Sequence, residues 1–235
     1  MHYAKVINGR FNGYLPDLNA KGASGKTYGD CSKLSLEQRK AEGIYKVHKV
    51  DNKPQYVGED GTKVTYPESF LVQSGHEAHA DTANAEWLIT TTYILRPVAE
   101  LRTMKVQELK ELRKSACLSG FYYKSHLIES GKDEVNSVTA IQLQYDKGTL
   151  PVNHIYSFRV TDAIYVDCNI GKDGNETSNG AEGFEVFAMM MANYVQLECF
   201  GREKTISLEI MKMTAKQLAM LDLPTTYQPD CGTPS

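Results

Sequence analysis

The chain has 235 residues, of which 41% are hydrophobic and 23% charged, and its formal net charge is −3. A pI near 6.1 gives no basic surface for nucleic acid. No apolar run reaches the roughly 20 residues that a membrane-spanning helix needs, and the start lacks the apolar stretch of a secretory signal. We therefore expect a soluble protein made in the cytosol, with no nucleic-acid partner and no membrane insertion.

The N-terminal segment has the pattern of a small β-hairpin or meander over residues 3–16. Two Asn-Gly pairs, Asn8-Gly9 and Asn12-Gly13, separate short β-prone pieces and predict turns. Residues 17–33 are polar and predict a loop.

A short helix and several strands are expected next. Ser35 is a suitable N-cap for a helix that begins at Leu36, and Gly43 is a suitable end for it. Strand composition then marks residues 43–50, 54–66 with Asp60-Gly61 as a hairpin turn, and 86–95.

The clearest helix is predicted from Val98 to Leu118. Pro97 precedes its first turn and Gly120 follows its last. One face carries the leucines Leu101, Leu109 and Leu112, and Lys105 interrupts that stripe. Such a helix either packs on its own domain or associates with copies of itself, and the seam is too short to predict a coiled coil.

The second half predicts alternating strands and helices. Residues 120–130 look like strand, 133–147 like helix, 154–169 like a strand pair, 184–201 like an apolar helix ending at Gly201, 204–213 like a short strand, and 214–223 like a short helix. Residues 169–183, rich in Gly and Asn, predict an exposed loop.

These elements together predict an α+β fold with four parts. A small, mixed, β-rich N-terminal attachment domain covers residues 1–97, and a charged connecting helix covers 98–118. An α+β C-terminal domain covers 119–223, and an extended tail covers 224–235.

The stretch "AKGASGKT", residues 20–27, is close to a phosphate-binding loop, with Ala20 in place of the first glycine. A phosphate loop joins a buried strand to a helix N-terminus, so that backbone N–H groups face the phosphates. The flanking residues predict neither a buried strand nor a helix. We therefore interpret the match as coincidence and expect no nucleotide site.

Other patterns also give no catalytic or cofactor site. His76, His79 and Asp81 are spaced so that a helix could place both histidines on one face as metal ligands, but no further ligand is evident. The alternative is a solvated segment with two surface histidines. The five cysteines have no metal-type spacing and predict reduced thiols. We expect a non-enzymatic protein without metal or cofactor.

Three stretches carry a resemblance to tail-fibre and baseplate-associated proteins of tailed bacteriophages. "LSLEQRKAEGIYKV" resembles a motif of small phage tail proteins, and "YILRPVAELRTMKVQELKELRKSA" resembles the joint of strand, proline and charged helix in tail-fibre proteins. The C-terminal stretches "GFYYKSHLIES", "DEVNSVTAIQLQ" and "MKMTAKQLAML" are similar to a domain of unknown function at the end of such proteins. The resemblance covers residues 34–222 in fragments, with a longer segment at 150–205 and an earlier stop at Pro224.

The resemblance implies a structural virion protein: a tail fibre, a fibre-to-baseplate adaptor or a baseplate component. Its partners would be other tail or baseplate proteins, copies of itself with a trimer favoured, and a host surface. It would be made in the bacterial host cytoplasm and located in the virion tail. The alternative is a tail-fibre assembly chaperone that is absent from the mature virion.

Three surfaces are candidates for assembly. The hairpin 3–16 is expected to attach to a partner, and the helix from Val98 to Leu118 to link or oligomerise. Leu101, Leu109 and Leu112 are its candidate assembly positions. The loop 169–183 is a third candidate contact.

Overall fold

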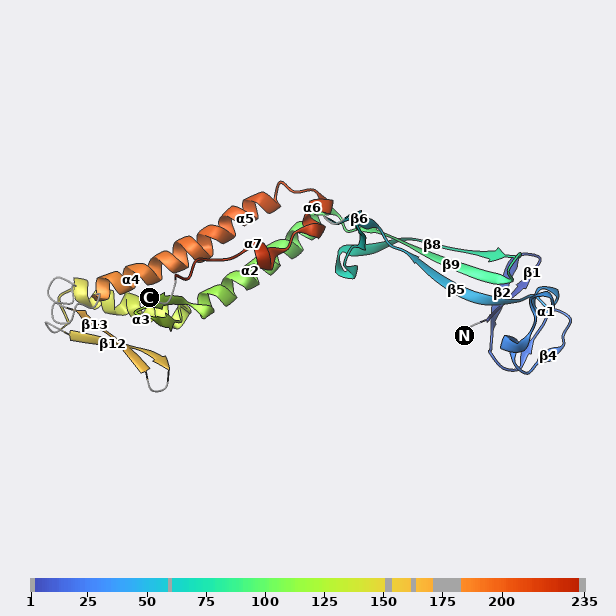
Figure 1. Ribbon diagram of the computed structural model, residues 1–235, viewed down its shortest axis with the longest axis horizontal. Helices are drawn as coiled ribbons and strands as arrows, with labels where there is room; N and C mark the ends of the chain where they lie inside the picture. Colours follow the sequence, from blue (N-terminus) through green and yellow to red (C-terminus); the bar gives the residue numbers. More distant parts are fainter. Residues whose placement is uncertain (1–2, 59–60, 151–153, 162–163, 171–182, 233–235) are drawn as a thin grey trace. The chain divides into compact units, whose positions relative to one another are not determined.

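The computed structural model describes residues 3–58, 61–150, 154–161, 164–170 and 183–232. The chain divides into two compact units, Met1–Pro97 and Val98–Ser235 (Figure 1). The first unit is built mainly from strands and the second mainly from helices, so the expected α+β class is confirmed.

A five-stranded mixed sheet forms the centre of the N-terminal unit. Its strands are β1 (Tyr3–Ile7), β2 (Arg10–Leu15), β5 (Ile44–Asn52), β8 (Leu71–Asp81) and β9 (Glu86–Leu95), in the order β2-β1-β5-β9-β8. Neighbours are antiparallel except for β5 and β9, which run parallel. Figure 1 shows β5, β8 and β9 side by side as a long ribbon.

The expected N-terminal hairpin is confirmed, but only one of the two Asn-Gly pairs forms a turn. Asn8 and Gly9 have φ angles of 49° and 76° and connect β1 to β2. Asn12 and Gly13 lie within β2, where the register with β1 shifts between Ala4 and Val6. The second Asn-Gly pair therefore forms a β-bulge and not a turn.

Shorter elements complete this unit. They are β3 (Ala20–Lys21), β4 (Thr27–Tyr28), η1 (Cys31–Lys33), α1 (Leu36–Ala41), β6 (Gln55–Val57), β7 (Lys63–Thr65) and η2 (Glu68–Phe70). Ser35 caps α1 in a reciprocal capping box with Gln38, as its position predicts. Gly43 follows with a φ of +61°, and a Cβ there would come within 2.3 Å of the Val6 carbonyl oxygen. Only glycine fits this end of the helix. Asp60 of the predicted turn lies outside the described residues, although the β6–β7 hairpin itself is present.

The sheet buries side chains on both of its faces near the hairpin end. One cluster contains Ala4, Val6, Tyr45, Trp87 and Ile89. The other contains Tyr3, Ala20, Cys31 and Ile44, packed beneath the segment that leads to α1. Towards Asn52 the side chains of β5 become exposed, so these two clusters lie near the hairpin end of the sheet, and Tyr66 and Leu71 are buried towards the other end.

The C-terminal unit combines long helices with two hairpins. Its elements are α2 (Val98–Ser119), β10 (Phe121–Tyr123), β11 (His126–Ile128), α3 (Lys132–Asp146), β12 (His154–Thr161), β13 (Ile164–Ile170), α4 (Phe184–Asn193), η3 (Tyr194–Gly201), α5 (Arg202–Ile210), α6 (Ala215–Met220) and α7 (Leu223–Thr226). The predicted helix 98–118 is confirmed, and α2 lies along α5 (Figure 1). It therefore belongs to this unit instead of standing between two domains.

The expected break at Gly201 is wrong. Residues from Phe184 to Ile210 form one continuous helix, in which η3 is a π-helix, and Gly201 has helical angles of −62° and −45°. The segment 204–213, expected as a strand, is mostly helical. The apolar core of the unit forms where this long helix meets α2, α3 and both hairpins.

Candidate functional site

A group of exposed apolar side chains lies on the β1–β2 hairpin and just after it. Tyr14 and Leu18 are 62% and 60% exposed, and Phe11 is 42% exposed. The Phe11 ring stacks on Trp87 with centroids 5.3 Å apart and meets Tyr14 edge-on at 4.9 Å. Phe11 thus fixes the hairpin against β9, while Tyr14 presents its ring to solvent. Aromatic rings held in this way supply contact area to a partner at little entropic cost.

The sheet that carries this hairpin has two edge strands, β2 and β8, and these two strands contact each other. Among the described residues β2 pairs only with β1, and β8 pairs only with β9. An edge strand presents unpaired backbone N–H and C=O groups that can accept a strand from another chain. The exposed aromatic group therefore lies on and just after an edge strand that has one hydrogen-bonded partner.

Two of the three candidate assembly leucines on α2 lie inside the unit. Leu101 and Leu109 have no exposed surface, and α2 packs against α5, α6 and α7. Leu112 is half-buried. The packing of α2 on its own unit accounts for the burial of Leu101 and Leu109, and neither is accessible to a second chain in this conformation.

Polar contacts also fasten α2 to the C-terminal segment. The Lys105 ammonium is buried and donates to the carbonyl oxygen of Leu221 and to Oε2 of Glu108, both at 2.9 Å. The Arg102 guanidinium donates to the carbonyl oxygen of Met213 at 3.2 Å. Lys105 interrupts the apolar stripe because it satisfies a carbonyl at the end of α6. The position of Lys105 in the stripe depends on Leu221, which is distant in the sequence, so it could not be predicted from the residues around Lys105.

The long helix α4–η3–α5 has a second, exposed apolar face. Met189, Leu197 and Leu208 are 56%, 64% and 56% exposed. The helix predicted over 184–201 already contains Met189 and Leu197, whereas Leu208 lies beyond its predicted end at Gly201. One pattern in the sequence does indicate a long helix: Phe187, Met191, Val195 and Cys199 recur every four residues, and all four are buried.

That interval explains the π-helix. Four residues overshoot one α-helical turn by about 40°, so a run of such steps drifts off one face. The wider turn of a π-helix, closed by i→i+5 hydrogen bonds, keeps the series facing the core.

The segment 20–27 is a small hairpin and not a phosphate loop. β3 pairs with β4, and no helix begins at its end. The donors of the loop converge on the Glu42 carboxylate: Ser24 Oγ and backbone N–H at 2.6 and 3.0 Å from Oε2, and Tyr28 O–H at 2.7 Å from Oε1. The Ser24 and Tyr28 hydrogen bonds lower the Glu42 pKa. The anion that these donors bind is therefore the Glu42 carboxylate of the same chain.

The histidine pattern lies on a strand and not on a helix. His76, His79 and Asp81 belong to β8, where side chains three apart point to opposite faces of the sheet. The Asp81 carboxylate accepts from the Asn84 side chain and from the backbone N–H groups of Ala83 and Asn84. The Asn84 side chain is the largest cause of its lowered pKa. Within the described part of the chain, no three potential ligands gather for a metal ion.

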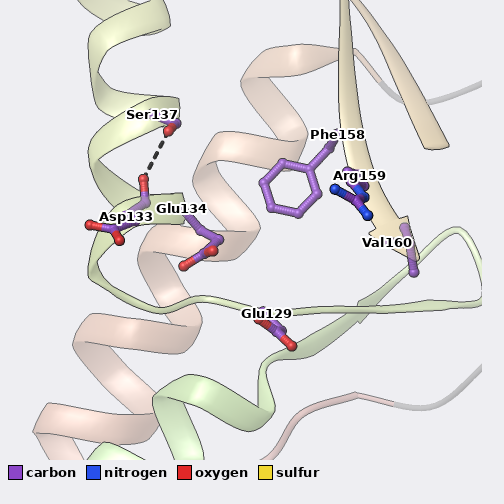
Figure 2. Close-up of a pocket in the computed structure, with 7 residues that line it drawn as sticks. All are labelled: Glu129, Asp133, Glu134, Ser137, Phe158, Arg159 and Val160. Carbon is purple, nitrogen blue, oxygen red and sulfur yellow. Dashed lines mark hydrogen bonds between the residues drawn. The ribbon is translucent and has the colours of Figure 1, made fainter. Parts of the chain in front are cut away.

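An acidic hollow of about 420 Å³ lies in the C-terminal unit between α3 and β12 (Figure 2). Glu129, Asp133 and Glu134 line one side, and Phe158 and Arg159 line the other. Ser137 Oγ donates to the Asp133 carbonyl oxygen at 2.8 Å, an ordinary contact within a helix. The hollow brings carboxylates together, but no contact in it indicates a particular ligand.

The third candidate contact, the loop 169–183, has its residues 171–182 outside the described part. No helix of the described residues is long and apolar enough to cross a membrane. Comparison with protein-family models, with curated proteins and with solved structures gave no match.

Proposed function

We propose that this chain is a structural protein of a phage tail, acting through protein–protein contacts and not as an enzyme. The observation that supports this most directly is the group of exposed apolar side chains, Phe11, Tyr14 and Leu18, on and just after the edge strand β2. The tail context rests on the resemblance of residues 34–222 to tail proteins. Within the tail, a fibre, a fibre-to-baseplate adaptor and a baseplate component all need such a surface.

The chemistry of the hairpin favours a protein partner. Tyr14 and Phe11 combine large apolar rings with few rotatable bonds, and Tyr14 adds a hydroxyl for a hydrogen bond. The neighbouring edge of β2 supplies backbone donors and acceptors. A partner strand laid along β2 would gain main-chain hydrogen bonds and cover the aromatic side chains in one step. In a tail, repeated copies would cover these edges by symmetry.

Solution mass and particle composition test the proposal. We expect light scattering after size-exclusion chromatography to give three times the chain mass of 26.3 kDa, and mass spectrometry to find the chain in purified phage particles. A monomer that binds fibre protein in the infected cell and is missing from particles would identify an assembly chaperone. A monomer that is missing from particles and binds no tail protein would refute both.

A matched pair of variants locates the surface. Tyr14 and Val57 are both 62% exposed in the same unit, so Tyr14→Glu and Val57→Glu introduce the same charge at equal exposure. We expect Tyr14→Glu to abolish assembly or incorporation into particles and Val57→Glu to leave both intact. Circular dichroism should show both variants folded. Equal behaviour of the two variants in assembly would contradict the hairpin as the attachment surface.

A further inference from the structure

A cleft of about 470 Å³ lies between three helices of the C-terminal unit. Its walls are the last turns of α2, the first turns of α3 and the π-helix η3. Clefts that bind small molecules in proteins have volumes of roughly 300–1,000 Å³. The cleft is therefore large enough for a small organic ligand.

Most of the lining of this cleft is apolar. Leu118 comes from α2, Val135 from α3, and Val195 and Phe200 from η3. Val195 is buried and Val135 half-buried, whereas Leu118 and Phe200 are exposed. A ligand with a hydrocarbon chain would cover this apolar surface and remove it from water, which favours binding.

The charged side chains among the described residues that line the cleft are all cationic: Arg113, Lys114 and Lys132. Arg113 contacts the Glu203 carboxylate at 2.6 Å, and Lys114 contacts the Glu111 carboxylate at 2.9 Å. Neither of these two carboxylates lines the cleft itself. A ligand in the cleft therefore meets positive charge and no lining carboxylate, so a negatively charged group is favoured over a positive one.

The start of α3 places a cation and an amide on the same side of the cleft. Lys132 and Asn136 are four residues apart on α3, so they lie on one face of the helix together with Val135. Both polar side chains are exposed, and both carry N–H donors that suit a carboxylate. The neighbouring acids Asp133 and Glu134 line the separate acidic hollow between α3 and β12.

The Arg113 side chain is held in the wall of the cleft. Its guanidinium lies 4.3 Å from the centre of the Phe200 ring and is mostly buried against Glu203. The Glu203 carboxylate offsets much of its charge, so Lys132 is the better partner for an incoming anion. Arg113 instead fixes the position of the Phe200 ring beside the apolar surface.

We propose that this cleft binds a medium-chain fatty acid, with its alkyl chain against Leu118, Val135 and Phe200. Its carboxylate accepts hydrogen bonds from Lys132 and Asn136. Because an ion pair with an exposed lysine contributes little, the alkyl chain supplies most of the binding free energy. Lys132 determines the preference for an acid over a neutral molecule of the same length.

Calorimetric titration of the full chain with hexanoate, octanoate and decanoate, all below their micelle-forming concentrations, tests the ligand class. We expect one site per chain and an affinity that rises about fourfold for each added methylene group. The neutral analogue 1-octanol should bind about two- to fivefold more weakly than octanoate. Absence of saturable decanoate binding, or an affinity independent of chain length, would overturn the proposal. Equal affinity for octanol and octanoate would overturn the role of the carboxylate.

Alkylation of the native thiols locates the ligand in the unmodified chain. Cys117 lines the cleft, whereas Cys231 lies outside it in the C-terminal segment, and both are half-buried free thiols. We expect saturating decanoate to slow the reaction of Cys117 with iodoacetamide and to leave that of Cys231 unchanged, as measured by mass spectrometry of the peptides. Unchanged reactivity of Cys117, or equal slowing of both thiols, would refute this location.

A matched pair of variants tests the cationic group. Lys132 and Lys204 are both exposed lysines of the C-terminal unit, and only Lys132 lines the cleft. We expect Lys132→Glu to weaken octanoate binding by about fivefold or more and to leave octanol binding unchanged, whereas Lys204→Glu should alter neither. A glutamate in the first turn of α3 suits the helix dipole, so Lys132→Glu should remain folded. Equal effects of the two variants on octanoate binding would contradict the assignment of Lys132.

The binding and alkylation measurements use the unmodified chain in solution. Their outcome does not depend on assembly, so the fatty-acid site and the tail proposal can fail separately.

Discussion

Replacement of Leu109 distinguishes a folding role of α2 from an assembly role. Leu109 has no exposed surface, and the helices that α2 packs against, α5, α6 and α7, belong to the same unit. Leu109→Ala removes one methine and two methyl carbons and leaves a cavity in the core. Buried leucine-to-alanine changes cost about 2–5 kcal/mol, and about 3 kcal/mol corresponds to a fall of roughly 10 °C in Tm for a unit of this size.

Leu118 is the matched control because it lies on the same helix with 61% of its surface exposed. We expect Leu118→Ala to change the free energy of unfolding by less than about 0.5 kcal/mol. Urea unfolding followed by circular dichroism measures both variants, and light scattering measures their molar mass at the same concentration. The reasoning is refuted if Leu109→Ala lowers the molar mass while the stability of the chain stays unchanged.

Three further perturbations test local features. Lys105→Ala should lower the free energy of unfolding by about 1–3 kcal/mol, because it removes the buried ammonium that donates to the Leu221 carbonyl oxygen and to Glu108; Lys114→Ala, at an exposed ion pair on α2, should have almost no effect in the same urea titration. Glu42 has a lowered pKa in the folded protein, so its contribution to stability is complete above its usual value of 4.5 and is lost as pH falls through the folded value. Amide exchange in the 20–28 hairpin should therefore accelerate as pH falls below about 4.5, after correction for intrinsic exchange, and Glu42→Gln should remove this dependence. Gly201→Ala should raise Tm, since a Cβ at this helical glycine would meet the Gln196 carbonyl oxygen at 3.4 Å, a van der Waals contact, and such a replacement gains about 0.4–1 kcal/mol; a fall in Tm would contradict the continuous helix.

Elements with a local chemical cause could be predicted from the sequence. Ser35 satisfies the first turn of α1 through its own side chain, and Asn8-Gly9 adopts the positive φ angles that a tight hairpin needs. Pro97 and Gly120 bracket α2 within a residue of its ends. In each case the energetic reason lies within a few residues, so no knowledge of the tertiary structure is required.

Elements that depend on distant neighbours were not predictable in this way. Asn12-Gly13 has the same composition as the true turn, and only the pairing of β2 with β1 makes it a bulge. Gly201 carries a normal helix-ending signal, but packing of Cys199 and Ile206 on the core carries the helix through it. The parallel pairing of β5 with β9 joins strands separated in the chain by the β6–β7 hairpin, η2 and β8, and nothing in either strand specifies it.

In the candidate site, too, features with a local cause could be predicted from the sequence and contacts between distant elements could not. The sequence placed the hairpin 3–16 correctly, but not the stacking of Phe11 on Trp87, because that contact crosses from β2 to β9. His76 and His79 share a helical face only if their segment is a helix, and the strand β8 separates them. The stripe of Leu101 and Leu109 could be predicted from the sequence. That α5, α6 and α7 pack against α2 could be learned only from the structure.

The distribution of exposed side chains favours the hairpin over the ribbon as the attachment surface. Past Ile89 the strand β9 continues with three threonines, whose β-branched shape suits a strand and whose hydroxyls tolerate water. The facing part of β5, from Lys49 to Asn52, is exposed and mostly polar. This stretch of ribbon can therefore remain solvated. Phe11 and Tyr14 have no such polar compensation across their ring faces, and a partner that covers them removes apolar surface from water. Along residues 49–52 and 90–92 the exposed large apolar side chain is Val50, so association at the hairpin removes more apolar surface from water than association along this stretch.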